Sequence, residues 1–245
     1  MQMLAPQVAD LDVRWRQAVL SVGQGPASSA DPYELEVSSL RAWSLQSDKR
    51  GSLQVLGVAG PGAVGKTSMR ARLVQAGCTP VLKSTSRPAR PGEVEGKDYF
   101  FVPDGAIRDH PENYLYTRFL RGRGWYAVAR EIWGQALTTG RPLLIEESPL
   151  QLRRILAAGG ESGLIVYMMP PAPMGETLVQ RYVQRNGGVC DTDSSSTLGT
   201  RQVEEFLEAR DMFLAQEPII FLVNDALERV VTVLCDIFRI QRDAI

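Results

Sequence analysis

LQVLGVAGPGAVGKT, residues 53–67, is the stretch that decides the fold of this chain. Its first half, Leu53 to Ala59, is a short apolar run that predicts a buried strand. Gly60 to Thr67 then fits the pattern G-x-x-x-x-G-K-[S/T], and Lys66 to Gln75 is predicted to be a helix that ends at Gly77. A phosphate-binding loop, or P-loop, requires a strand before it and a helix after it, and both are predicted here. A glycine-rich turn with a chance Lys-Thr pair would need neither.

The residue types of this loop suit phosphate chemistry. Glycines let backbone N–H groups turn inward around a phosphate, and the N-terminus of the following helix adds about half a positive charge. Lys66 is expected to reach the β- and γ-phosphates, and the hydroxyl of Thr67 is expected to bind Mg²⁺. The motif predicts ATP binding with Mg²⁺ as the metal cofactor, but it does not by itself predict a kinase. The expected ATP-binding residues of the loop are Gly60, Gly62, Val64, Gly65, Lys66, Thr67 and Ser68.

The chain after residue 52 alternates strand patterns with helix patterns. Further short apolar runs predict buried strands at Pro142 to Glu146, Gly163 to Met168 and Ile219 to Val223. Helices are predicted at Glu176 to Arg185, Arg201 to Gln216 and Ala226 to Arg239. Such alternation predicts an α/β fold, in which helices flank a parallel sheet.

The first 51 residues lie outside this alternation. Gln7 to Leu20 places apolar residues among charged ones at helical spacing, which predicts an amphipathic helix. Asp31 has the character of an N-cap, with Pro32 at the first helical position, and predicts a second helix to about Leu45.

The domain organisation follows from this contrast. We expect residues 1–51 to form a helical N-terminal extension with a linker, and residues 52–245 to form the main domain. The extension carries no cluster of candidate catalytic residues. It is expected to pack on the main domain or on a second subunit, and in the second case the protein would be a homodimer.

Composition narrows the classes of function. The chain has 27 basic and 28 acidic residues, a formal net charge of −1, so no global charge indicates a nucleic-acid partner. Its single histidine, His110, argues against a histidine-based metal site or a catalytic triad, and its three cysteines lack metal-ligand spacing. No window reaches the roughly 18 apolar residues that span a membrane. We therefore expect a cytoplasmic protein with neither a nucleic-acid nor a membrane partner.

Thr85 to Val102 is the most specific stretch in the chain. It contains Arg87 and Arg90, followed by Gly92, Glu93 and the pair Asp98-Tyr99. Two arginines three residues apart can clamp one phosphate dianion, because each offers paired donors, and a tyrosine hydroxyl can complete the site. The sequence thus predicts a second phosphate site besides the P-loop.

This stretch resembles the segment of guanylate kinase that binds the phosphate of GMP, where the family pattern reads approximately T-T-R-x-P-R-x-G-E-x-x-G-x-D-Y-x-F-V. The resemblance covers about Leu53 to Ile240. It implies a P-loop kinase with an inserted acceptor-binding subdomain at about 84–127 and a mobile lid at about 186–200. It also implies roles for individual residues. The acceptor phosphate would be bound by Arg87, Arg90, Tyr99 and Tyr126, the lid arginines would be Arg181, Arg185 and Arg201, and Asn224 would lie near the adenine of ATP.

The resemblance fails on the side of the acceptor site that would read the base. The family reads guanine with a Ser, a Glu and an Asp, and the ungapped counterparts here are Lys83, Thr117 and Ser148. Recognition mainly through the phosphate, with a weakened preference for guanine, is therefore expected. A short gap could instead bring Glu112, Glu146 or Glu147 into the role of the missing carboxylate, and Glu146 is included with Thr117 among the candidate acceptor-binding residues.

The mechanism that these residues imply is direct in-line transfer of the γ-phosphoryl group of ATP to an acceptor phosphate. Its catalytic residues would be Lys66, Arg87, Arg181, Arg185 and Arg201, which position and neutralise the phosphates. Three functions fit the sequence: conversion of GMP to GDP, phosphorylation of another phosphorylated acceptor such as a different nucleotide or a sugar phosphate, and a nucleotide-binding or interaction module without turnover. The intact Lys66 and Thr67 disfavour the third.

Overall fold

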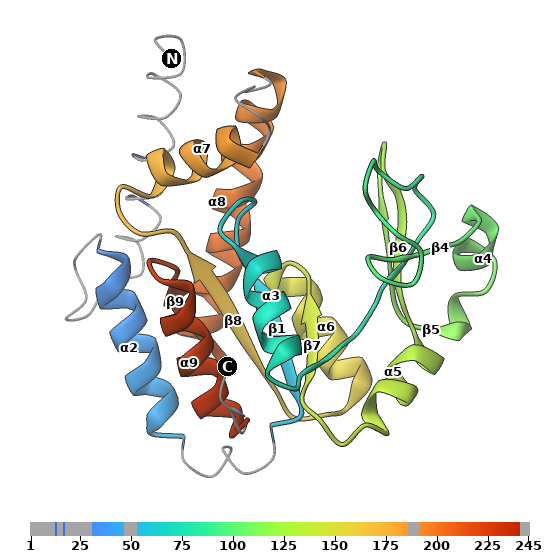
Figure 1. Ribbon diagram of the computed structural model, residues 1–245, viewed down its shortest axis with the longest axis horizontal. Coiled ribbons are helices and arrows are strands. Elements are labelled where there is room, and N and C mark those ends of the chain that lie inside the picture. Colours follow the sequence, from blue (N-terminus) through green and yellow to red (C-terminus); the bar gives the residue numbers. More distant parts are fainter. Residues whose placement is uncertain (1–12, 14–16, 18–30, 47–52, 186–191, 241–245) are drawn as a thin grey trace.

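The computed structural model describes residues 31–46, 53–185 and 192–240, together with positions 13 and 17. Its described part contains a five-stranded parallel sheet and, to one side of it, a four-stranded mixed sheet (Figure 1). The first predicted helix, Gln7 to Leu20, lies outside the described residues except for those two positions. The predicted linker at 47–52 lies outside them as well.

The parallel sheet forms because the apolar runs of the sequence are buried on both faces. Its strand order is β2-β7-β1-β8-β9, and every neighbouring pair is parallel. The strands are β1 (Val55–Ala59), β2 (Thr79–Pro80), β7 (Leu143–Glu146), β8 (Gly163–Met169) and β9 (Ile219–Val223). The predicted strands are confirmed to within two residues, whereas β2 was not predicted, because two residues are too few to show a pattern.

Helices cover both faces of this sheet, as predicted (Figure 1). α3 (Lys66–Gln75) and α9 (Leu227–Phe238) pack together on one face, and α6 (Pro149–Gly159) and α8 (Thr192–Leu214) pack together on the other. α7 (Met174–Arg185) precedes α8, and α5 (Arg130–Leu137) leads from the mixed sheet back to β7. The chain thus has the α/β architecture that the alternation of strand and helix patterns predicts.

The mixed sheet has the strand order β4-β3-β6-β5. β5 (Tyr114–Leu120) and β6 (Gly124–Ala129) form an antiparallel hairpin, and the two-residue strands β3 (Ser84–Thr85) and β4 (Phe100–Phe101) extend it. The short helices α4 (Asp104–Arg108) and η2 (Pro111–Asn113) connect β4 to β5. None of these strands was predicted, because β3 and β4 are held by long-range pairing rather than by local pattern.

The backbone of the structure differs from the predicted lid, which was expected at about 186–200. Residues 186–191 lie outside the described residues, and α8 begins at Thr192 rather than at Arg201. Residues 192–200, which the resemblance places in the lid, are rich in Ser and Thr. These residue types are favourable in the first turns of a helix, so the composition of the predicted lid does not exclude a helix there.

α2 (Pro32–Ser44) packs along β9, the edge strand of the parallel sheet. Asp31 is its N-cap, as predicted, and accepts a hydrogen bond from the backbone N–H of Tyr33 at 2.9 Å. Two buried polar residues of α2 close the exposed edge of β9. The N–H of Phe221 donates to Ser39 Oγ at 3.0 Å, and the N–H of Val223 donates to Glu36 Oε2 at 2.6 Å.

Contacts of α2 also reach the segment after β9. Glu36 forms an ion pair with Arg229, and Arg229 in turn bonds Asp225 at 2.9 Å. The hydroxyl of Tyr33 donates to Asp225 at 3.0 Å. Leu35 and Trp43 are buried in the same core as the sheet. The second helix of the predicted extension therefore packs on the main domain, one of the two placements that the sequence left open.

Glu36→Ala is expected to lower the free energy of unfolding by about 2 kcal/mol, because it leaves the buried N–H of Val223 without its acceptor and removes the partner of Arg229. Urea unfolding followed by circular dichroism measures the change. Glu34→Ala is the matched control on the same helix, since Glu34 is exposed and its loss should cost less than about 0.5 kcal/mol. Equal stability of the two variants would contradict the assigned role of Glu36.

Among the helices that the structure describes, none is both long and apolar enough to cross a membrane. The two described cysteines, Cys78 and Cys235, are free and buried, and burial raises the pKa of the Cys78 thiol to about 12. Cys190 lies outside the described residues.

Candidate active site

The P-loop connects β1 to α3 and takes the backbone conformation that its glycines permit. Gly60 and Gly65 have φ values of 138° and 104°, which other residues rarely adopt. A Cβ atom on Gly65 would lie 2.4 Å from Nδ2 of Asn224, and one on Gly60 would lie 2.6 Å from the carbonyl oxygen of Met168. The loop is therefore tightly enclosed by the ends of β8 and β9, so neither glycine can be replaced without displacing its neighbours.

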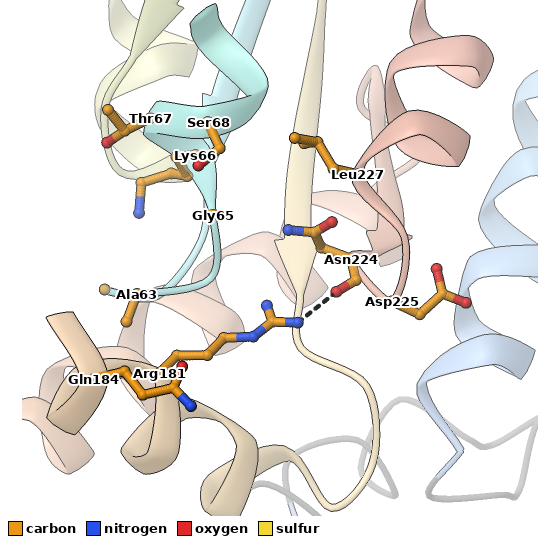
Figure 2. Close-up of a pocket in the computed structure, with 11 residues that line it drawn as sticks. Ala63, Gly65, Lys66, Thr67, Ser68, Arg181, Gln184, Asn224, Asp225 and Leu227 are labelled. Atoms are coloured by element: carbon orange, nitrogen blue, oxygen red, sulfur yellow. Dashed lines mark hydrogen bonds between the residues drawn. The ribbon is translucent and has the colours of Figure 1, made fainter. Parts of the chain in front are cut away.

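A cavity of about 750 Å³ lies beside the P-loop (Figure 2). Eleven residues line this cavity, and six of them are predicted ATP-binding residues. The other five come from α7, from the P-loop itself and from the segment after β9. The predicted ones are Gly62, Gly65, Lys66, Thr67, Ser68 and Asn224, and the others are Ala63, Arg181, Gln184, Asp225 and Leu227. Gly60 and Val64 are buried and support the loop from behind.

Lys66 stands at the phosphate end of this cavity. Its ammonium group donates to the carbonyl oxygens of Gly60 and Pro61 at 2.7 and 2.8 Å. These bonds hold the side chain folded back over the loop that would bind a phosphate. A bound nucleotide would offer the ammonium group phosphate oxygens, which are stronger acceptors because they are charged.

Arg181 from α7 and Asn224 from the end of β9 line the other side of the cavity, and Figure 2 shows the guanidinium of Arg181 directed at the backbone carbonyl oxygen of Asn224. Arg181 donates to the carbonyl oxygens of Val64 and Asn224 at 3.2 and 2.9 Å, and Asn224 Nδ2 donates to Val64 at 2.7 Å. Arg185 is the last residue of α7, and Arg201 lies within α8. The structure does not describe the side chains of these two arginines.

The site fits a magnesium–nucleotide complex. Thr67 lines the cavity next to Lys66, at the start of α3. In the described part of the chain, no group of three or more His, Cys, Asp or Glu residues could hold a metal ion. Mg²⁺ needs few protein ligands, because nucleotide phosphates and waters supply most of its coordination.

A second, smaller cavity of about 160 Å³ lies at the mixed sheet. All four predicted phosphate-binding residues line it: Arg87, Arg90, Tyr99 and Tyr126. Five further residues complete its wall: Lys83, Arg118, Leu120, Arg123 and Glu147. The fold therefore brings these four residues together, along with residues that are up to 64 positions apart, such as Lys83 and Glu147.

The two clamp arginines differ in their surroundings. Arg87 is buried, and its guanidinium donates to both carboxylate oxygens of Glu93, at 2.6 and 2.7 Å, and to the hydroxyl of Tyr126 at 3.1 Å. It also lies 4.9 Å from the ring centre of Tyr99. The hydrogen bonds from Arg87 lower the pKa of Glu93 to about 2. Arg90 is exposed, so one arginine is rigidly held and the other is available to a ligand.

The far end of this cavity holds a charged network of Lys83, Glu147 and Arg118. Lys83 donates to Glu147 Oε2 at 2.8 Å and to the carbonyl oxygen of Glu146 at 2.7 Å, and Arg118 pairs with Glu147 Oε1 at 3.5 Å. Burial opposes both charges, but mutual attraction outweighs it, so the pKa of Lys83 is raised and that of Glu147 is lowered. The carboxylate and the ammonium group therefore stay charged at neutral pH.

Two predicted acceptor-binding residues are not among the described residues that line the cavity. Thr117 precedes Arg118 on β5, and successive side chains of a strand point to opposite faces, so Arg118 reaches the cavity in its place. Glu146 faces Arg70 of α3 at 3.9 Å, whereas the next residue, Glu147, faces the cavity. Glu112 pairs with His110 on the exposed η2 segment.

Sequence reasoning missed Glu93, Arg118 and Arg123 as residues of this site. Glu93 offered a signal, since it lies six residues after Arg87 within the most specific stretch of the chain. Arg118 and Arg123 offered none, because only the register of the β5–β6 hairpin shows which of its residues face the cavity.

Glu146 at the carboxyl end of β7 connects the P-loop helix with the second cavity. Its side chain faces Arg70 of α3, and its carbonyl oxygen accepts from Lys83, which lines that cavity. Crevices beyond the carboxyl ends of parallel strands are the usual ligand sites of α/β folds. The chain thus has one cavity suited to a nucleoside triphosphate and another suited to a second phosphorylated molecule.

No family model matches the chain, but individual relatives do. It is 34% identical over 175 residues to a guanylate kinase of Rhodococcus jostii, which covers 67% of this chain and 78% of that protein. It is 32% identical over 181 residues to one of Trichodesmium erythraeum, covering 73% and 90%, and 29% identical over 199 residues to one of Syntrophus aciditrophicus, covering 80% and 89%.

Among solved structures, a guanylate kinase from Anaplasma phagocytophilum matches with a TM-score of 0.53 at 17% identity, over 78% of this chain and 88% of that one. At this identity the match shows the fold alone. The sequence matches to the Rhodococcus and Trichodesmium proteins go further, because each exceeds 30% identity over most of the relative's length. The chain described here belongs to the guanylate kinase family.

Proposed function

We propose that this protein transfers the γ-phosphoryl group of ATP to the phosphate of a nucleoside monophosphate, with GMP as the first acceptor and GDP as its product. The observation that carries the proposal is the presence of two cavities whose lining residues suit phosphate binding. One is the P-loop cavity with Lys66, and the other is the clamp of Arg87 and Arg90. The names of the related proteins support GMP over other acceptors.

The chemistry needs positioning and charge neutralisation rather than a covalent intermediate. Lys66 and Arg181 would neutralise the transferring phosphoryl group, and Arg185 and Arg201 are proposed to join them from the lid. Arg87, Arg90, Tyr99 and Tyr126 would hold the acceptor phosphate in line. Mg²⁺ bound by Thr67 and the nucleotide phosphates would supply further neutralisation of charge.

Release of ADP, coupled to oxidation of NADH, tests this proposal. We expect turnover that requires ATP, Mg²⁺ and GMP together, with ADP release in the absence of acceptor at least about a hundredfold slower, because closure over both substrates excludes water. Turnover that responds to no nucleoside monophosphate would refute the proposal. A sugar phosphate tested in the same assay would then be the next acceptor, since the clamp itself recognises only a phosphate.

A further inference from the structure

The second cavity is lined by charged side chains that do not belong to the predicted phosphate clamp. Beyond Arg87 and Arg90 it is lined by Lys83, Arg118, Arg123 and Glu147. Glu147 is the only carboxylate that lines it within the described residues. Because the acceptor phosphate occupies the clamp, the rest of the acceptor must lie against these remaining groups.

Arg118 and Glu147 lie side by side in this wall, with Arg118 Nη1 3.5 Å from Glu147 Oε1. A guanidinium presents five N–H donors in a planar fork, so the pairing with Glu147 leaves donors for a ligand. The carboxylate is nearly buried, at 11% exposure of its side chain, and is held in place by Lys83 and by the backbone N–H of Ser148 at 3.1 Å. The wall therefore offers two donors next to one fixed acceptor.

This order of donors and acceptor matches one class of base edge. A 6-oxopurine such as guanine or hypoxanthine offers two acceptors, N7 and O6, followed by one donor, N1–H. Arginine binds the N7 and O6 pair of guanine with two parallel hydrogen bonds in many complexes. Adenine offers an acceptor, a donor and an acceptor along the same edge, so its amino group would face the guanidinium and its N1 would face the carboxylate.

We propose that Arg118 and Glu147 read the acceptor base, with Arg118 donating to O6 and N7 and Glu147 accepting from N1–H. The acceptor class is then the 6-oxopurine monophosphates, and the exocyclic amino group of guanine is not required. This inference rests on the proposed function, since it takes the cavity to be the acceptor site. It assigns base recognition to residues other than Lys83, Thr117 and Ser148, which the resemblance aligns with the guanine-reading positions.

Equilibrium binding of GMP, IMP and AMP by isothermal titration calorimetry tests the inference separately from turnover. We expect GMP and IMP to bind within about tenfold of each other and AMP to bind about a hundredfold more weakly, the loss expected for a mismatched bidentate contact. AMP binding within threefold of GMP would overturn the proposal, as would IMP binding a hundredfold more weakly than GMP. Lack of turnover with any of the three would count against the proposed function but not against this ranking.

Arg118→Lys provides the sharper test, because it keeps the positive charge and removes the planar pair of N–H donors. We expect the affinity for GMP and IMP to fall about tenfold and that for AMP to change less than about threefold. An equal loss for all three nucleotides would show that Arg118 acts only through the phosphate or the fold, and would overturn the proposal. Arg121→Lys is the matched control, since Arg121 is an exposed residue of the same hairpin that does not line the cavity.

Glu147→Gln tests the other half of the pattern. The amide has the same shape but carries no charge, so the GMP-to-AMP affinity ratio should fall at least about tenfold. Because Glu147 also pairs with Lys83, the thermal midpoint of this variant is measured alongside. An unchanged affinity ratio in a folded variant would overturn the role of Glu147, and if this variant does not fold, the Arg118→Lys result decides.

Discussion

Lys66→Ala is expected to abolish measurable phosphoryl transfer, a loss of about a thousandfold in kcat. Lys66 lines the cavity beside the P-loop, and the proposed transfer needs cations to stabilise the charge that develops on the γ-phosphoryl group. Its ammonium group donates to two backbone carbonyl oxygens of its own loop, those of Gly60 and Pro61. Removing the side chain should therefore change the stability of the fold by no more than about 1 kcal/mol.

The measurement is the coupled release of ADP at saturating ATP and GMP, with the thermal midpoint recorded for each variant. Arg72→Ala is the matched control on the same helix, because the side chain of Arg72 bonds Glu228 and Gln75 at the exposed surface and its loss should leave turnover unchanged. Activity of Lys66→Ala within tenfold of the wild type, still dependent on ATP, would rule out the kinase assignment.

Arg87→Ala and Arg90→Ala are expected to raise the KM for GMP by about 10- to 100-fold each, because a charge-assisted hydrogen bond contributes about 1.5–3 kcal/mol. The KM for ATP should barely change, since neither residue lines the P-loop cavity within the described residues. Steady-state kinetics with one substrate varied at a time separates the two constants.

The structure predicts that these two variants differ in stability. Arg90 is exposed, so its removal should leave the thermal midpoint close to that of the wild type. Arg87 is buried against Glu93 and Tyr126, so Arg87→Ala leaves a carboxylate without its partner and should also lower the midpoint. If Arg87→Ala lowers stability without raising the KM for GMP, then Arg87 only supports the loop and is not a phosphate ligand.

The pairing of Arg87 with Glu93 also has a consequence at low pH. The pKa of Glu93 is lowered to about 2 in the folded state, so this pair contributes stability that is complete above the carboxyl group's ordinary pKa. That contribution is lost as the pH falls from about 4.5 toward 2, where Glu93 becomes protonated. At neutral pH the clamp is therefore insensitive to small changes in pH.

The local sequence pattern was sufficient to predict each segment whose structure depends mainly on its own residues. The apolar runs at β1, β7, β8 and β9, the P-loop glycines and the N-cap at Asp31 all behave as the sequence predicts, because burial, φ freedom and capping act over a few neighbouring residues. The residues of the predicted phosphate clamp follow a pattern specific enough to indicate a family, and the fold gathers them at one cavity.

Tertiary structure alone decided which residues face the second cavity. Thr117 and Arg118 are neighbours on β5, as Glu146 and Glu147 are at the end of β7, and a shift of one residue moves a side chain to the opposite face. That choice is set by strand pairing with β6 and by the bonds of Lys83, which join segments more than 60 positions apart. The pairing of α2 with the edge of β9 is of the same kind, because Glu36 and Val223 are 187 positions apart in sequence and meet only in the folded chain.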